Sequence, residues 1–136
     1  VLPDRVDENL LSWLGAQRLK VVMVIHCNHP NEIDAGVIEA MHRLHRAGVV
    51  LLNQSVLLRD INDDAATLIN MSERLFAAGA LTYYLHQLDR VQGAAHFEVD
   101  RKIARKLIAE VGAFLPGYLV PRLVQEIPGM PGKTPL

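Results

Sequence analysis

A pattern that recurs about every thirty residues constrains the fold of this chain more than any other feature. Two copies place an Arg-Leu pair before an Ala-Gly step and a continuous apolar run: HRLHRAGVVLLNQS (42–55) and SERLFAAGALTYYLHQLD (72–89). An earlier segment, QRLKVVMVIHCNHP (17–30), has the same basic start, apolar run and polar end. We therefore expect a repeated unit that ends in a buried strand.

The glycines within the repeat indicate where helices end. Gly48 and Gly79 precede the apolar runs, and glycine readily adopts the left-handed conformation that terminates a helix. The runs that follow show no alternation of polar and apolar residues, which is typical of parallel strands covered on both faces. The repeated unit is therefore predicted to contain a helix, a glycine that ends the helix, and a buried strand.

Helical periodicity fills the intervals between these runs. Apolar stripes are expected to form helices within 33–44, 68–78 and 103–111, and an opening helix is expected at about 6–16. Asp63 or Asp64 is a plausible N-cap for the second stripe, and Asp100 precedes the third. Alternating strands and helices predict an α/β fold with a parallel sheet, built as a partial (β/α) barrel in a single domain, 1–136.

The number of strands limits this prediction. Three strands are clear, and FLPGYLV (114–120) is a candidate for a fourth. An eight-stranded barrel cannot close with so few strands. Either the sheet is small and open, or the chain is one part of a barrel.

Composition excludes several classes of partner. The 136 residues carry a net charge of -1, which leaves no electrostatic footprint for nucleic acid or an anionic membrane. No apolar run approaches the ~20 residues of a membrane helix, and no signal peptide is visible. The single cysteine, Cys27, cannot form an internal disulfide, so we expect a cytoplasmic protein. The chain opens without methionine, and we expect a piece of a longer protein.

Polar residues follow each of the three clear strands. They are HCNHPNE (26–32), NQS (53–55) and HQLD (86–89). Ligands of parallel α/β sheets bind at the carboxyl ends of the strands, so the three segments together predict a shared site.

Structural explanations of these residues remain open. His26, His29 and Glu32 have a spacing that could serve a metal, but Pro30 breaks the helix that would align them, and we expect no metal ligands in this chain. The segment 29–31 is equally consistent with a turn that leads into a helix cap, and 53–54 with the capping of a strand end.

The last eleven residues, EIPGMPGKTPL (126–136), contain three prolines, two glycines and Lys133. Composition alone favours a strand, a turn and a loose tail. The alternative is a rigid proline and glycine frame that holds the Lys133 amine in place.

Four long segments carry a resemblance to a known family. They are HCNHPNEI (26–33), LLNQSVLLRDIND (51–63), YYLHQLDRVQGAAHF (83–97) and GYLVPRLVQEIPGMPGKTPL (117–136). In this order and spacing they closely resemble the carboxyl-terminal half of the lysine 2,3-aminomutase family, over essentially the whole chain. The branch they resemble most makes (R)-β-lysine from L-α-lysine for the modification of elongation factor P.

The resemblance implies a radical S-adenosylmethionine enzyme with a partial (β/α) barrel. In that family a 4Fe-4S cluster and S-adenosylmethionine generate a radical, pyridoxal phosphate holds the substrate lysine, and the amino group migrates from the α to the β carbon. The family's cluster motif, CxxxCxxC, is absent from this chain. The resemblance therefore implies that the cluster ligands lie in a missing amino-terminal half of the barrel, and that this chain alone is inactive.

The resemblance also implies roles for five residues. Lys133 matches the lysine that binds pyridoxal phosphate covalently, which places the cofactor-bearing segment at 117–136. Asp89 and Glu126 match the acidic residues that hold the far ammonium of the substrate; Glu126 replaces the aspartate of the clostridial enzymes. His26 and Gln54 match residues near S-adenosylmethionine.

Two other classes of function stay open at this point. One is a non-catalytic binding or structural remnant of the same fold. The other is a different pyridoxal phosphate enzyme on a barrel, such as a racemase, which needs no iron. An open barrel segment exposes strand edges and apolar surface, so we also expect self-association of this chain into a homo-oligomer.

Overall fold

The computed structural model describes residues 2–88 and 95–136. One sheet contains β1 (Val22–His26), β2 (Val50–Leu57), β3 (Ala80–Gln87), β4 (Arg122–Gln125) and β5 (Thr134–Pro135), in that spatial order. The first four strands are parallel, and β5 is antiparallel to β4. The predicted α/β fold with a parallel sheet is confirmed.

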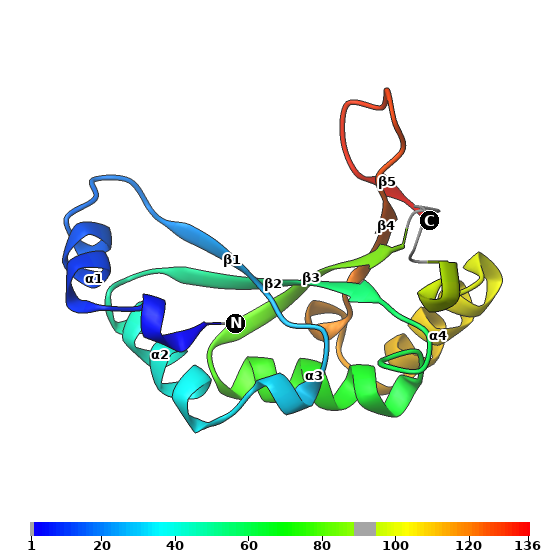
Figure 1. The fold of residues 1–136 in the computed structure, drawn as a ribbon, viewed down its shortest axis with the longest axis horizontal. Helices are drawn as coiled ribbons and strands as arrows, with labels where there is room; N and C mark the ends of the chain where they lie inside the picture. The colour runs from blue at the N-terminus through cyan, green and yellow to red at the C-terminus, as the bar shows by residue number, and fades with distance from the viewer. Residues whose placement is uncertain (1, 89–94) are drawn as a thin grey trace.

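The helices connect the strands in sequence order. They are α1 (Glu8–Gly15), α2 (Ala35–Arg46), α3 (Ala65–Ala77) and α4 (Arg101–Phe114), with short 3-10 turns at Pro3–Arg5, Pro30–Glu32, Ala95–Phe97 and Gly117–Leu119. Figure 1 shows α2, α3 and α4 on the same side of the sheet. Right-handed crossovers between strands in sequential order place successive helices on one face, as in a (β/α) barrel.

Local signals in the sequence explain where the helices begin and end. The Asp64 side chain accepts a hydrogen bond from the Thr67 backbone N–H and caps α3, which selects Asp64 over Asp63. Asp100 caps α4 in the same way. After α2 and α3, Gly48 (φ 85°) and Gly79 (φ 98°) take the left-handed conformation that ends each helix.

The core lies between the helical layer and the covered face of the sheet. Its largest fully buried side chains include Met41, Leu51, Leu57, Leu68, Met71, Leu75 and Leu85. Each buried aliphatic side chain of this size contributes about 1.5–3 kcal/mol through removal from water. The helical stripes predicted from periodicity supply this layer.

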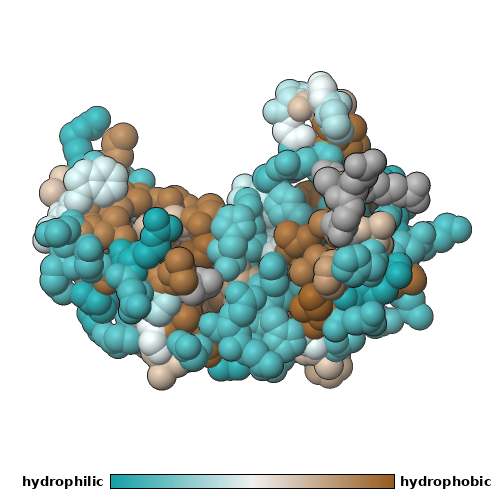
Figure 2. Space-filling view, in the orientation of Figure 1, coloured by the Kyte–Doolittle hydropathy of each residue, from teal (hydrophilic) through white to brown (hydrophobic). Residues whose placement is uncertain are grey.

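The expectation that the strands are covered on both faces is wrong for the described residues. Burial alternates along β2, with every second residue partly exposed. On the open face Val22 is 54% exposed, and β1 is an edge strand. Figure 2 shows hydrophobic residues at the surface between α1 and the centre of the sheet. Val24 and Val50 extend this apolar face.

The predicted fourth strand is displaced along the chain. The segment 114–120 contains the end of α4 and the turn Gly117–Leu119 instead of a strand, and β4 follows at Arg122–Gln125. Pro116, inside the predicted strand, has no N–H for a ladder. The apolar character of this segment comes from packing of Leu115 and Leu119 into the core.

The interpretation of the last residues as a loose tail is also wrong. Pro135 and Thr134 of β5 pair with Val124 and Gln125 of β4, and the Leu136 N–H donates to the Leu123 carbonyl at 3.1 Å. The intervening loop, 126–133, projects from the edge of the sheet (Figure 1). None of the helices in 2–88 and 95–136 combines the length and the apolar composition needed to cross a bilayer.

The burial of α3 residues predicts that substitutions at two nearby positions differ in their effect on the free energy of unfolding. Leu75 is fully buried and Glu73 is exposed. We expect Leu75→Ala to lower the free energy of unfolding by about 2–5 kcal/mol, because it leaves a cavity under the sheet. Glu73→Ala should change it by less than about 0.5 kcal/mol. Urea unfolding measures both, and equal effects of the two substitutions would contradict this placement of α3.

Candidate functional site

The carboxyl ends of β1, β2 and β3 meet the loop between β4 and β5 at one cavity of about 330 Å³. Residues from four separate segments of the chain line it: His26, Gln54, Ser55, Val56, His86, Gln87, Leu88, Glu126 and Lys133. The structure therefore brings together four of the five predicted site residues, His26, Gln54, Glu126 and Lys133. The fifth, Asp89, lies outside the described residues.

Parallel pairing sets the positions of the first two residues. His26 of β1 pairs with Gln54 of β2. Neither residue is buried: His26 is exposed and Gln54 is half-buried. An imidazole and a carboxamide at the rim of the cavity supply hydrogen-bond donors and acceptors to a polar ligand.

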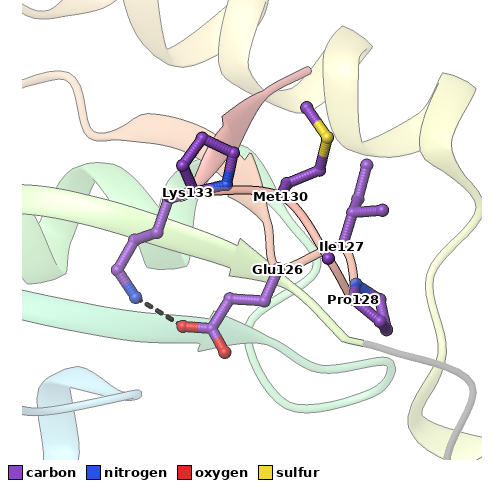
Figure 3. Close-up of a pocket in the computed structure, with 8 residues that line it drawn as sticks. Glu126, Ile127, Pro128, Met130 and Lys133 are labelled. Carbon is purple, nitrogen blue, oxygen red and sulfur yellow. Dashed lines mark hydrogen bonds and ion pairs between the residues drawn. The ribbon is translucent and has the colours of Figure 1, made fainter.

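The pairing of β4 with β5 sets the positions of Glu126 and Lys133. Gln125 is opposite Thr134, so the next residues outward on the two arms of the hairpin are Glu126 and Lys133. The Lys133 Nζ lies 2.7 Å from the Glu126 Oε1. Figure 3 shows these two side chains pointing to the same side of the loop, with Ile127 and Met130 on the opposite side. The hairpin thus holds an amine and a carboxylate together at the cavity.

The loop itself surrounds a larger hollow of about 560 Å³, lined only by residues 126–133. Gly129 has φ 83°, and the Met130 N–H donates to the Ile127 carbonyl at 3.1 Å, which forms a turn at the tip. The two charged residues of the loop, Glu126 and Lys133, also line the smaller cavity at the strand ends. We therefore place the site at the strand ends.

The charges of the pair favour an ionised carboxylate. The hydrogen bond from Lys133, and then its positive charge, hold the pKa of Glu126 below its ordinary value of 4.5. Partial desolvation opposes this shift, and His86 adds a smaller lowering. The Lys133 side chain is 27% exposed and that of Glu126 66% exposed, so the amine is the more enclosed member of the pair.

An aromatic residue of β3 lies beside the amine, and a second one packs against it. The Lys133 Nζ is 5.7 Å from the centroid of the Tyr84 ring, within the range of a cation–π contact. The His86 ring meets the Tyr84 ring edge-on, with centroids 5.9 Å apart. The site therefore includes His86, to which the sequence assigned no role, although it stands in the polar segment at the end of its strand.

A buried asparagine joins the ends of β1 and β2. The Cys27 N–H donates to the Asn53 Oδ1 at 2.9 Å, and the Asn53 Nδ2 donates to the Cys27 carbonyl at 3.1 Å. Asn53 is only 1% exposed. The structural explanation of this residue is thereby confirmed, whereas its neighbour Gln54 faces the cavity.

A second buried asparagine extends the same connection. The Asn62 Nδ2 donates to the carbonyls of Asn28 and Val56, each at 2.8 Å, and its Oδ1 accepts from the Leu58 N–H. The Val56 N–H donates to the Asn28 Oδ1. These residues satisfy backbone groups at the carboxyl ends of β1 and β2, where the pairing of these two strands with each other has ended. Sequence reasoning missed them because asparagine in a turn gives no sign of its partners.

The polar segment after β1 has a structural role. His29 Nδ1 accepts from the Asn31 N–H, and the Glu32 Oε1 accepts from the N–H groups of Asn28 and His29, so the predicted turn into a cap is confirmed. In the described parts of the chain, no three histidine, cysteine or acidic residues gather in a metal-binding group. Burial, and then Glu32, raise the pKa of the Cys27 thiol to about 11, which keeps it protonated.

Comparison with known proteins identifies relatives along the whole chain. L-lysine 2,3-aminomutase of Escherichia coli K12 is 52% identical over 136 residues, which cover all of this chain and 40% of that protein. L-lysine 2,3-aminomutase of Haemophilus influenzae is 48% identical over 134 residues, 98% of this chain and 40% of that protein. The resemblance to this family is confirmed, and the chain spans about two fifths of the length of these curated relatives.

The fold also has a solved counterpart. A radical SAM methyltransferase from Sphaerobacter thermophilus superposes with a TM-score of 0.61, at 14% identity, over 86% of this chain and 37% of that one. At this identity the likeness concerns the fold alone, and it agrees with a partial radical SAM barrel. No protein-family model matches the chain.

The asparagine connection predicts a loss of stability with a matched control. Asn62 is fully buried, whereas Asn70 is exposed on α3. Asn62→Ala leaves buried backbone groups unpaired, and we expect it to lower the free energy of unfolding by about 2–3 kcal/mol. Asn70→Ala should leave it within about 0.5 kcal/mol. Urea unfolding tests this, and an Asn62→Ala protein as stable as Asn70→Ala would contradict it.

The ion pair between Lys133 and Glu126 predicts a lowered pKa of Glu126, which NMR of the Glu126 carboxyl carbon measures. We expect Glu126 to titrate below 4.5 in the folded protein, and Lys133→Met to raise its pKa. Because the folded pKa is lowered, the pair stabilises the fold above the unfolded pKa, and this contribution disappears as pH falls through the folded pKa. Lys106→Met, on α4, is the control. An unchanged Glu126 titration in Lys133→Met would show that the pair does not form.

Proposed function

We propose that this chain, a relative of L-lysine 2,3-aminomutases along its whole length, forms the cofactor-lysine part of such an isomerase. In the full-length protein it would help to convert L-α-lysine to (R)-β-lysine, for the modification of elongation factor P. One observation carries the proposal: Lys133 and Glu126 of the β4–β5 loop, His26 of β1 and Gln54 of β2 line a single cavity. Residues 1–136 would form one partial barrel domain, in which 117–136 supplies the lysine.

The described residues fit pyridoxal phosphate in one essential respect. Covalent attachment needs a primary amine that is held beside a cavity and shielded from bulk water. The Lys133 amine meets this requirement, because its side chain is 27% exposed and lines the cavity at the strand ends. When bound, pyridoxal phosphate supplies an aldehyde that joins amino groups and a ring that withdraws electrons from them.

Attachment would change the partner of Glu126. Once its nitrogen bonds to an aldehyde carbon, Lys133 is no longer a primary ammonium and keeps at most one of its three N–H donors, so its hold on Glu126 weakens. Glu126 would then be a carboxylate available at the edge of the cavity, ionised at neutral pH because even the ordinary pKa of a glutamate, 4.5, lies well below 7. A carboxylate in this position suits the side-chain ammonium of a lysine substrate. Asp89 is proposed as the second carboxylate, on the sequence resemblance alone.

The opposite side of the cavity suits a polar ligand of a different kind. His26 and Gln54 are neighbours across β1 and β2, and we assign them to S-adenosylmethionine. The residues present do not fit a 4Fe-4S cluster, which requires several thiolates. Cys27, the single cysteine, is fully buried, and its thiol has a pKa of about 11.

The proposal predicts that one lysine is indispensable. In the full-length protein, reduced and given S-adenosylmethionine and pyridoxal phosphate, Lys133→Ala should abolish the conversion of α-lysine to β-lysine. Lys106→Ala, an exposed lysine on α4, should retain it. Chromatographic separation of the two amino acids measures the conversion.

A chemical readout separates attachment from turnover. The Lys133 nitrogen adds to the aldehyde carbon and water leaves; borohydride then reduces the resulting double bond and makes the link permanent. Mass spectrometry should find the added pyridoxyl group on the peptide that contains Lys133. Retained turnover in Lys133→Ala, or labelling of another lysine in the wild-type protein, would contradict the assignment.

A further inference from the structure

An irregularity in β3 governs which way its tyrosines point. Asn53 of β2 is opposite Thr82, but the next residue, Gln54, is opposite Tyr84. Tyr83 is therefore an extra residue in β3, as in a β-bulge. In a regular strand two successive side chains would point to opposite faces.

The bulge brings the two tyrosine rings together. Their centroids are 3.8 Å apart, and the Tyr83 hydroxyl donates to the Tyr84 hydroxyl at 3.1 Å. The Tyr84 ring also packs against the His86 ring, with an interplanar angle of 73°. Two neighbours of the same strand thus hold the Tyr84 ring, while the Lys133 amine lies 5.7 Å from its centroid. Bulges next to functional sites commonly re-aim a side chain in this way.

We propose that Tyr84 is a positioning residue for Lys133: the bulge at Tyr83 turns its ring toward the Lys133 nitrogen and so directs this nitrogen to the cavity. The inference rests on the proposed function, because positioning matters where Lys133 reacts. Tyr84 acts through Lys133 and does not line the cavity in the described part of the chain.

The division of roles between Glu126 and Tyr84 supports this assignment. Both contact the same nitrogen, Glu126 at 2.7 Å and the Tyr84 ring at 5.7 Å. A carboxylate that is to receive a substrate ammonium has to leave Lys133. An aromatic face needs no such exchange, because it attracts any cationic nitrogen above it, including the protonated nitrogen of a double bond to carbon. Tyr84 therefore holds the Lys133 nitrogen both before and after this nitrogen is bonded to carbon.

The experiment compares the wild-type Tyr84 with a variant that keeps an aromatic ring and a variant that has none. Tyr84→Phe keeps the aromatic face and removes the hydroxyl, whereas Tyr84→Leu removes both. In the full-length protein, the rate of borohydride-trapped attachment of pyridoxal phosphate to Lys133 should stay within about twofold in Tyr84→Phe. It should fall about two- to fivefold in Tyr84→Leu, the range expected for a partly exposed cation–π contact. Phe114→Leu, at an exposed aromatic residue that ends α4, is the control and should not change the rate.

A second measurement needs no cofactor. A ring face shifts nearby protons upfield in NMR spectra, so the ε-methylene protons of Lys133 should be shifted in the wild type and in Tyr84→Phe, and unshifted in Tyr84→Leu. Lack of this shift in the wild type, or equal trapping rates in the wild type and Tyr84→Leu, would overturn the role of Tyr84. A rate in Tyr84→Phe as low as in Tyr84→Leu would overturn it too. Absence of trapping at Lys133 in the wild type would instead contradict the proposed function.

Discussion

The parallel register of β1, β2, β3 and β4 is the constraint on which the site depends. Parallel strands in sequential order direct their carboxyl ends to one edge of the sheet, and the crossing helices then share one face. His26 and Gln54 are side by side only because β1 and β2 pair in this register. Asn53 binds both backbone groups of Cys27, so the register is held at the edge where the cavity lies.

The antiparallel pairing of β5 with β4 brings the Lys133 amine to this edge of the sheet. A lysine on a free tail would sample many positions, and the entropy of fixing it would oppose any reaction that needs it in place. Pairing of Thr134 with Gln125 removes most of that freedom, and the Glu126 and Tyr84 contacts orient the amine. The prolines and glycines of the loop are consistent with a short, closed connection that returns the chain to the sheet.

Local chemistry explains which features could be predicted from the sequence. The helix ends at Gly48 and Gly79 and the cap at Asp64 follow from backbone preferences that act within a few residues, and the sequence reveals them. The meeting of the strand ends follows from topology once the strands are known. The role of Asn62 depends on partners in two other segments, and the orientation of Tyr84 depends on a bulge defined only against β2. Such long-range pairings leave no periodic signal, and the same is true of β5, whose proline and glycine neighbours resemble a tail.

The central claim is that Lys133 and Glu126 exchange partners when the site is loaded. A crystal structure of the full-length protein with pyridoxal phosphate and L-lysine tests it most directly. We expect continuous density from the cofactor to Lys133 or to the substrate amine beside it, with Glu126 in contact with the substrate's side-chain ammonium. A cofactor bound away from this cavity, with the Lys133–Glu126 pair intact, would contradict the account.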